Sequence, residues 1–183
     1  MTETTAPAAS HDVVIAATQQ WIERAVIGLN LCPFAKAVYA KGQIRYVVSD
    51  ATTPEALADD LQREMELLAE ASAEKIDTTL LIHPQALTDF LDHNDLLDVA
   101  DGMLEELELD GILQVASFHP QFQFEGTELD DITNYTNRAP FPILHLLRED
   151  SVERAVAAFA DELEIASTNI VTLESCGQSG WAD

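Results

Sequence analysis

The sequence predicts one compact domain of the α+β or α/β class, with a small central sheet of about four strands flanked by helices. The chain has 183 residues and is 47% hydrophobic, which suits a single domain with a sizeable core. Short apolar runs of strand length alternate with longer segments whose apolar residues follow helical spacing. We expect the globular domain at residues 12–176, between a disordered tail at 1–11 and a C-terminal tail at 177–183.

The first expected helix follows Asp12, which can cap it, and it weakens at Gly28 and Asn30. Pro33 suits the first position of a second, short helix, so Cys32 should lie at or beside its cap. Free N–H groups and the helix dipole would favour a thiolate there, with Lys36 one turn further on. The alternative is that Cys32 is a small buried hydrophobe in an apolar corner.

Residues 44–48 are expected to form a strand after Gly42 ends the short helix. Thr53 and Pro54 then cap and begin a long helix. Its predicted buried stripe is Leu57, Leu61, Met65 and Leu68, and its acids are assigned mostly to the solvent face: Asp59, Asp60, Glu64, Glu66 and Glu70.

Two further predicted strands, 78–82 and 112–118, each end in His-Pro. Because Pro cannot donate to a sheet ladder, His83 and His119 should be the last residues of these strands. A helix at 96–109 joins them, and if the strands run parallel both histidines emerge at the carboxyl edge, where open α/β sheets bind ligands. We interpret His83 alone as a surface residue at a strand end, whereas His119 begins a loop of aromatic and amide side chains.

The segment 125–139 has no secondary-structure period, and a loop of this length is usually functional or disordered. Arg138 precedes a Pro-Phe-Pro step that stiffens the backbone, so its guanidinium could bind a carboxylate or phosphate. The alternative is a structural bridge to Asp130 or Asp131. Residues 143–147 follow as an edge strand or the start of a helix, and on a strand His145 would point to core or pocket. Helices at 152–160 and 168–175 complete the chain.

The strongly acidic composition bears on which partners the protein can bind. The sequence has 33 acidic residues against 9 Lys plus Arg, a formal net charge of -24, which argues against nucleic acid and membrane partners. No apolar run approaches the roughly 20 residues of a membrane helix. The first ten residues lack the features of a secretory signal, so Cys32 and Cys176 are expected to be reduced thiols in the cytoplasm.

Several stretches resemble the bacterial family called domain of unknown function 1415. They are Trp21-Ile22, V-I-G-L-N-L-C-P-F-A-K from Val26, A-S-F-H-P-Q-F-Q-F from Ala116, and N-Y-T-N-R-A-P-F-P-I-L-H-L-L-R-E from Asn134. The resemblance spans nearly the whole chain after the tail. The resemblance implies no particular reaction, cofactor or fold. The matching stretches do contain the residues that are candidates for a functional site because of their chemistry, such as Cys32, His119 and Arg138.

The first functional hypothesis is a small-molecule enzyme or ligand-binding protein with a pocket for an anionic metabolite. Cys32, His119 and His145 would be its catalytic residues, and an acid group would be bound by Lys36, Asn134, Asn137 and Arg138. No ligand pair has typical metal-site spacing, so no metal is assigned, and the cofactor is left open. The second hypothesis is a non-catalytic protein-interaction module whose acidic surface attracts a basic partner.

Overall fold

The computed structural model describes residues 9–158 and 162–182. These residues form a four-stranded mixed sheet with helices on both sides, which confirms the predicted fold class. The elements are α1 (His11–Trp21), η1 (Ile22–Ile27), α2 (Ala35–Ala40), β1 (Ile44–Val48), α3 (Pro54–Glu70), β2 (Thr78–Ile82), α4 (Phe90–Glu106), β3 (Leu113–Phe118), η2 (Ile132–Asn137), β4 (Ile143–Arg148), α5 (Glu149–Ala158) and α6 (Glu162–Ala182).

The strand order is β1-β2-β4-β3. β1 pairs with β2 in parallel, whereas β4 runs antiparallel to both of its neighbours, β2 and β3. β3 is therefore parallel to β2, and the carboxyl ends of β1, β2 and β3 lie at one edge of the sheet. The prediction that His83 and His119 emerge at the same edge is confirmed.

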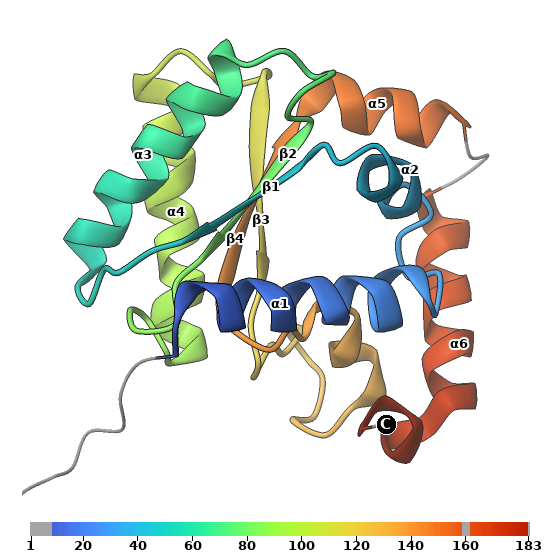
Figure 1. Cartoon of the computed structure of the whole chain (residues 1–183). Helices are drawn as coiled ribbons and strands as arrows, with labels where there is room; N and C mark the ends of the chain where they lie inside the picture. Colours follow the sequence, from blue (N-terminus) through green and yellow to red (C-terminus); the bar gives the residue numbers. More distant parts are fainter. Residues whose placement is uncertain (1–8, 159–161, 183) are drawn as a thin grey trace, which may run out of the picture.

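Two apolar cores cover the two faces of the sheet. On one face α3 and α4 pack against side chains such as Leu81 and Leu144, and on the other α1, η1 and α2 pack against Leu80 and Ile143. The helices α3 and α4 lie on one side of the sheet and α1 lies on the other (Figure 1). Because neighbouring residues of a strand point to opposite faces, His145 lies on the α1 side. His119, one residue after Phe118 of the α1 side, lies on the α4 side.

The predicted start of α3 is confirmed, since Thr53 accepts a hydrogen bond from the backbone N–H of Ala56 at 3.3 Å. Its predicted apolar stripe is buried. Glu64, however, is also buried, so its assignment to the solvent face is wrong. The reason is Arg45 of β1, whose Nε and Nη2 donate to the two Glu64 carboxylate oxygens at 2.7 and 3.0 Å. Such a two-pronged ion pair allows a carboxylate to lie inside a protein.

Other boundaries differ from those predicted. α4 begins at Phe90 because Asp89 caps it, accepting from the backbone N–H of Leu91, and α5 follows β4 directly. Ser10, not Asp12, precedes α1. Gly177 has φ 66 and ψ 172, which interrupts α6 at the predicted end of the domain, but the backbone is helical again to Ala182. Most of the predicted N-terminal tail, residues 1–8, lies outside the described residues. Within the described part of the chain, no helix combines the length and apolar character needed to cross a membrane.

Candidate functional site

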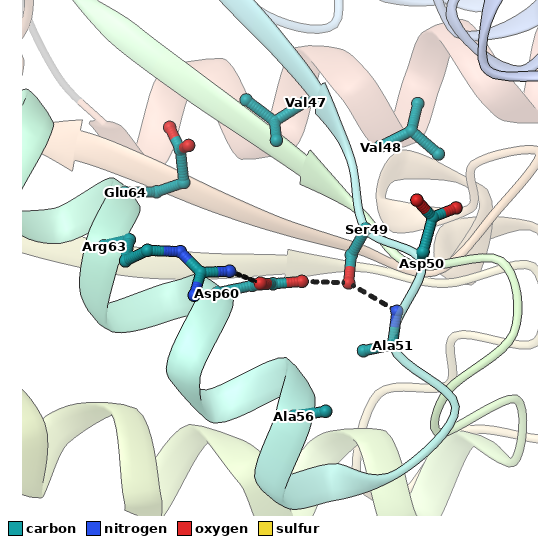
Figure 2. Close-up of a pocket in the computed structure, with 9 residues that line it drawn as sticks. All are labelled: Val47, Val48, Ser49, Asp50, Ala51, Ala56, Asp60, Arg63 and Glu64. Carbon is teal, nitrogen blue, oxygen red and sulfur yellow. Dashed lines mark hydrogen bonds and ion pairs between the residues drawn. The ribbon is translucent and has the colours of Figure 1, made fainter.

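A cavity of about 460 Å³ opens where β1 ends and α3 begins. We call it the Ser49 pocket, and its lining residues are Val47, Val48, Ser49, Asp50, Ala51, Ala56, Asp60, Arg63 and Glu64 (Figure 2). The pocket lies at the carboxyl edge of the sheet, because Ser49 follows the last residue of β1 directly. That edge is where open α/β sheets usually bind ligands.

Ser49 and Asp60 form the polar centre of the Ser49 pocket. The Ser49 hydroxyl donates to Asp60 Oδ2 at 2.5 Å and accepts from the backbone N–H of Ala51 at 3.1 Å. The other Asp60 oxygen pairs with Arg63, so a continuous chain of polar groups runs across the pocket (Figure 2). Ser49 is only 3% exposed, and its two hydrogen bonds fix the orientation of its hydroxyl. A ligand that donates a hydrogen bond would meet a carboxylate already held in place.

Acidic groups outnumber basic groups in the lining of the pocket. The lining contains three carboxylates, those of Asp50, Asp60 and Glu64, and one cationic side chain, that of Arg63. Each carboxylate has a protein partner, since Glu64 pairs with Arg45 and Asp50 with His11 Nε2 at 2.7 Å. Both the His11–Asp50 and Arg63–Asp60 pairs are partly open to water, so a ligand can compete for them.

The structure brings four of the predicted site residues together in the 119–139 loop. The backbone N–H of His119 donates to the carbonyl oxygen of Asn137 at 3.1 Å, and Asn137 Nδ2 donates to the Ser117 carbonyl at 3.2 Å. The loop thus returns to the end of β3. Asn134 is fully buried: its Oδ1 accepts from the Phe124 N–H at 2.9 Å and its Nδ2 donates to the Glu128 carbonyl at 2.9 Å. Both ends of that amide bind the loop itself.

Arg138 also holds the loop. Its Nε donates to the Phe122 carbonyl at 3.2 Å, its Nη2 donates to the Leu129 carbonyl at 2.6 Å, and its guanidinium lies 4.4 Å from the centroid of the Tyr135 ring. A guanidinium over an aromatic ring gains cation–π attraction. The partners of Arg138 are therefore backbone carbonyls, whereas the sequence predicted a ligand or an aspartate.

His145 lies on β4, which settles the choice between strand and helix left open by the sequence. Its Nε2 is 2.7 Å from the Thr78 hydroxyl, and burial lowers its pKa to about 4. Its side chain lies on the face of the sheet opposite to His119 and contacts the Phe118 ring, with centroids 5.7 Å apart. The structure therefore does not bring the two predicted catalytic histidines together.

Cys32 lies in the turn between η1 and α2. Its backbone N–H donates to the Val26 carbonyl at 3.4 Å, and its carbonyl accepts from Ala35 at 3.2 Å. Burial raises the pKa of the thiol and outweighs the backbone N–H groups of Ala35 and Phe34, which lower it. Of the two alternatives for Cys32, the raised pKa favours the small buried thiol over the thiolate, and α2 itself begins only at Ala35.

Lys36 is exposed on α2. In the part of the chain that the structure describes, no hydrogen bond, ion pair or ring contact joins Cys32 or Lys36 to the predicted residues of the 119–139 loop or to His145.

We expect Cys32 to react with iodoacetamide at neutral pH more slowly than free cysteine does, because a raised pKa leaves less thiolate. Mass spectrometry of the labelled chain against time measures the rate, and the same chain in denaturant is the control. Labelling faster than that of free cysteine would restore Cys32 as a candidate nucleophile.

A cluster of imidazoles occupies the same edge of the sheet as the Ser49 pocket. We call it the histidine cluster: His83 after β2, His93 on α4 and His119 after β3. The ring centroids of His83 and His93 are 5.1 Å apart, as are those of His93 and His119. His83 is 0% exposed, so its interpretation as a surface residue is wrong. α4, which carries His93, packs over this end of the sheet and covers it.

Sequence reasoning missed both Ser49 with Asp60 and His93. Ser49 follows a strand that was predicted, so the carboxyl-edge rule applied to His83 and His119 would also have found it. His93 precedes Leu96 and Ala100 at helical spacing, which places it on the buried stripe of α4. Among the described residues, no group of three or more His, Cys, Asp and Glu side chains is arranged to hold a metal ion.

Comparison with known proteins gives a family but no nearer relative. No curated protein and no solved structure matches the chain. One family model matches residues 13–183, nearly the whole chain. The chain therefore belongs to the family described as protein of unknown function (DUF1415).

Proposed function

We propose that this protein binds a small, positively charged molecule, such as an amine, in the Ser49 pocket. The observation that carries the proposal is the hydrogen-bonded pair of Ser49 and Asp60 inside a 460 Å³ cavity with two further carboxylates in its lining. An ammonium group has only donors, and it would match the fixed carboxylate of Asp60.

The proposed ligand differs in sign from the anion expected from the sequence. The amide of Asn134 and the guanidinium of Arg138, which were expected to bind an acid group, donate to carbonyls of the 119–139 loop. A net charge of -24 also repels small anions and raises the local concentration of cations. The same field opposes nucleic acid and anionic membranes, whose absence as partners stays a prediction.

We expect Asp60→Asn to weaken amine binding by about 10-fold to 100-fold, because a hydrogen bond to a charged group contributes roughly 1.5–3 kcal/mol. Calorimetric titration at low salt with ethanolamine and putrescine, against acetate and succinate, measures the effect. Glu70→Gln is the matched control, since Glu70 is an exposed acid at the far end of α3. Binding of the acids but not the amines, or equal losses in both variants, would contradict the proposal.

A basic protein is the second candidate partner. Exposed carboxylates follow the outer side of α4, at Asp92, Asp95, Asp98, Glu105 and Glu106. No Lys or Arg occurs between Lys75 and Arg138. Salt-sensitive binding of polylysine that persists in Asp60→Asn would favour this interaction module over the pocket.

We also propose a cytoplasmic location. Both cysteines are free thiols, and neither is fully exposed, which suits a reducing compartment.

A further inference from the structure

The histidine cluster brings together three segments that are distant in the sequence. His83, His93 and His119 are each at most 1% exposed. His93 Nε2 lies 3.2 Å from the Ser117 hydroxyl, and three other ring nitrogens have no hydrogen-bond partner: Nε2 of His83, Nδ1 of His93 and Nε2 of His119. Buried polar atoms without partners are uncommon, and they make a charged form of these rings costly.

The hydrogen bonds of His119 fix which of its nitrogens carries the proton. Its Nδ1 accepts from the backbone N–H of Gln121 at 3.0 Å, so the neutral ring carries its hydrogen on Nε2. His83 is the reverse case, since a carbonyl oxygen, that of Ala86, lies 2.8 Å from its Nδ1 and requires a hydrogen there. The imidazolium form carries a hydrogen on both nitrogens. It would therefore lose the hydrogen bond that Nδ1 accepts at His119, but it would keep the one that Nδ1 donates at His83.

His119 holds both ends of the 119–139 loop. Its ring binds the turn that begins the loop, through Gln121, and its backbone N–H binds the end of the loop, through the Asn137 carbonyl. If Nδ1 became a donor, it would face the Gln121 N–H, and two donors would oppose each other. The closed turn thus requires a neutral His119.

The groups that face His119 set the conditions for this change. Burial lowers the pKa of His119, whereas the carbonyls of Thr88 and Leu87 and the carboxylate of Asp89, the cap of α4, raise it. From β2 and α4 the facing titratable groups are His83 and His93, whose pKa values burial lowers to about 4 and about 3. All three rings are neutral at neutral pH. In acid, an imidazole that is exposed to water binds a proton more readily than the same imidazole when it is buried.

We propose that His119 is an acid-sensitive latch, which releases the 119–139 loop from the carboxyl edge of the sheet when its imidazole takes up a proton. The release is confined to the 119–139 loop. It follows from the protonation of one side chain, His119, whose hydrogen bond holds that loop. The latch does not depend on what the Ser49 pocket binds.

Hydrogen exchange of the full chain tests the latch. Between about pH 8 and pH 5, the exchange of the Gln121, Phe124 and Asn134 amides, corrected for the intrinsic pH effect, should rise by up to roughly 30-fold. An imidazole that regains its ordinary pKa near 6.5 favours the open loop by that factor at pH 5. The Leu81 amide of β2 should stay protected. Exchange of the loop amides only together with Leu81 would show global unfolding and overturn the proposal.

His119→Asn is the sharpest variant, because its amide oxygen can accept from Gln121 near the position of Nδ1 but cannot be protonated. The acid-induced rise in loop exchange should disappear in it and persist in the control His11→Asn, which changes a half-exposed histidine. A rise that persists in His119→Asn would overturn the latch. In the unmodified chain, nitrogen NMR of the imidazoles should show His119 protonated on Nε2 alone at pH 8. Doubly protonated His119 should grow in step with loop exchange, and its formation in a closed loop would equally overturn the proposal.

Discussion

Acidification from about pH 8 to pH 5 is expected to lower the free energy of unfolding by about 4 kcal/mol through His83 and His93 alone. Burial lowers their pKa values from 6.5 to about 4 and about 3. In the unfolded chain both imidazoles regain the ordinary value and bind protons at pH 5, which stabilises that state by roughly 2 kcal/mol per imidazole. The loss is large beside a typical stability of about 5–15 kcal/mol.

The direction follows from which state binds more protons. A histidine with a lowered pKa is neutral in both states above about pH 6.5, so its full contribution to stability is present there. As the pH falls below 6.5, only the unfolded state takes up the proton, and stability falls until the folded-state pKa is reached. His145, with its pKa lowered to about 4, acts in the same direction.

Urea unfolding at several pH values between 8 and 5 measures the effect. His93→Gln should remove about 2 kcal/mol of the pH-dependent loss of stability, because the amide can still reach the Ser117 hydroxyl but does not titrate. His11→Gln, which changes a half-exposed histidine outside the histidine cluster, is the control and should leave the pH dependence caused by His83 and His93 in place. A stability that is flat over this range would show that water reaches the histidine cluster in the folded protein.

Strand-length apolar runs and helix caps made most of the fold predictable. The strands at 44–48 and 78–82 have the predicted bounds, and Thr53 caps α3 as expected, because these signals are local. β4 lies between β2 and β3, so the expectation of an edge strand at 143–147 is wrong. The position of β4 depends on long-range pairing, such as that of Leu80 with His145 and of His145 with Ala116.

The candidate site was less predictable because the roles of polar residues depend on their neighbours. Arg138 looked suited to a ligand, yet carbonyls of Phe122 and Leu129 accept its hydrogen bonds, and no sequence pattern shows that. Glu64 was assigned to the surface because the sequence does not show that Arg45 lies opposite it. The histidine cluster was predicted in part, since the strand ends located His83 and His119, but the helix expected at 96–109 did not include the first turns of α4, which carry His93.

Asn134→Ala is expected to cost about 3 kcal/mol of stability, since it removes both ends of a buried amide and leaves the Phe124 N–H and the Glu128 carbonyl without partners. From the sequence, Asn134 is expected to bind a ligand, and the structural and ligand-binding roles predict different results for Asn134→Ala. If the amide is structural, Asn134→Ala lowers the denaturation midpoint and increases hydrogen exchange throughout the 119–139 loop. If the amide binds a ligand instead, Asn134→Ala changes the ligand affinity and leaves the denaturation midpoint nearly unchanged.

Chemical denaturation at neutral pH distinguishes these roles for Asn134. Asn94→Ala is the control, because Asn94 is exposed on α4 and alanine is a better helix former, so its effect should be close to zero or slightly stabilising. A loss below about 1 kcal/mol for Asn134→Ala would mean that water can replace the amide. The loop would then be organised by its backbone and by Arg138, and Asn134 would again be a candidate for binding a ligand.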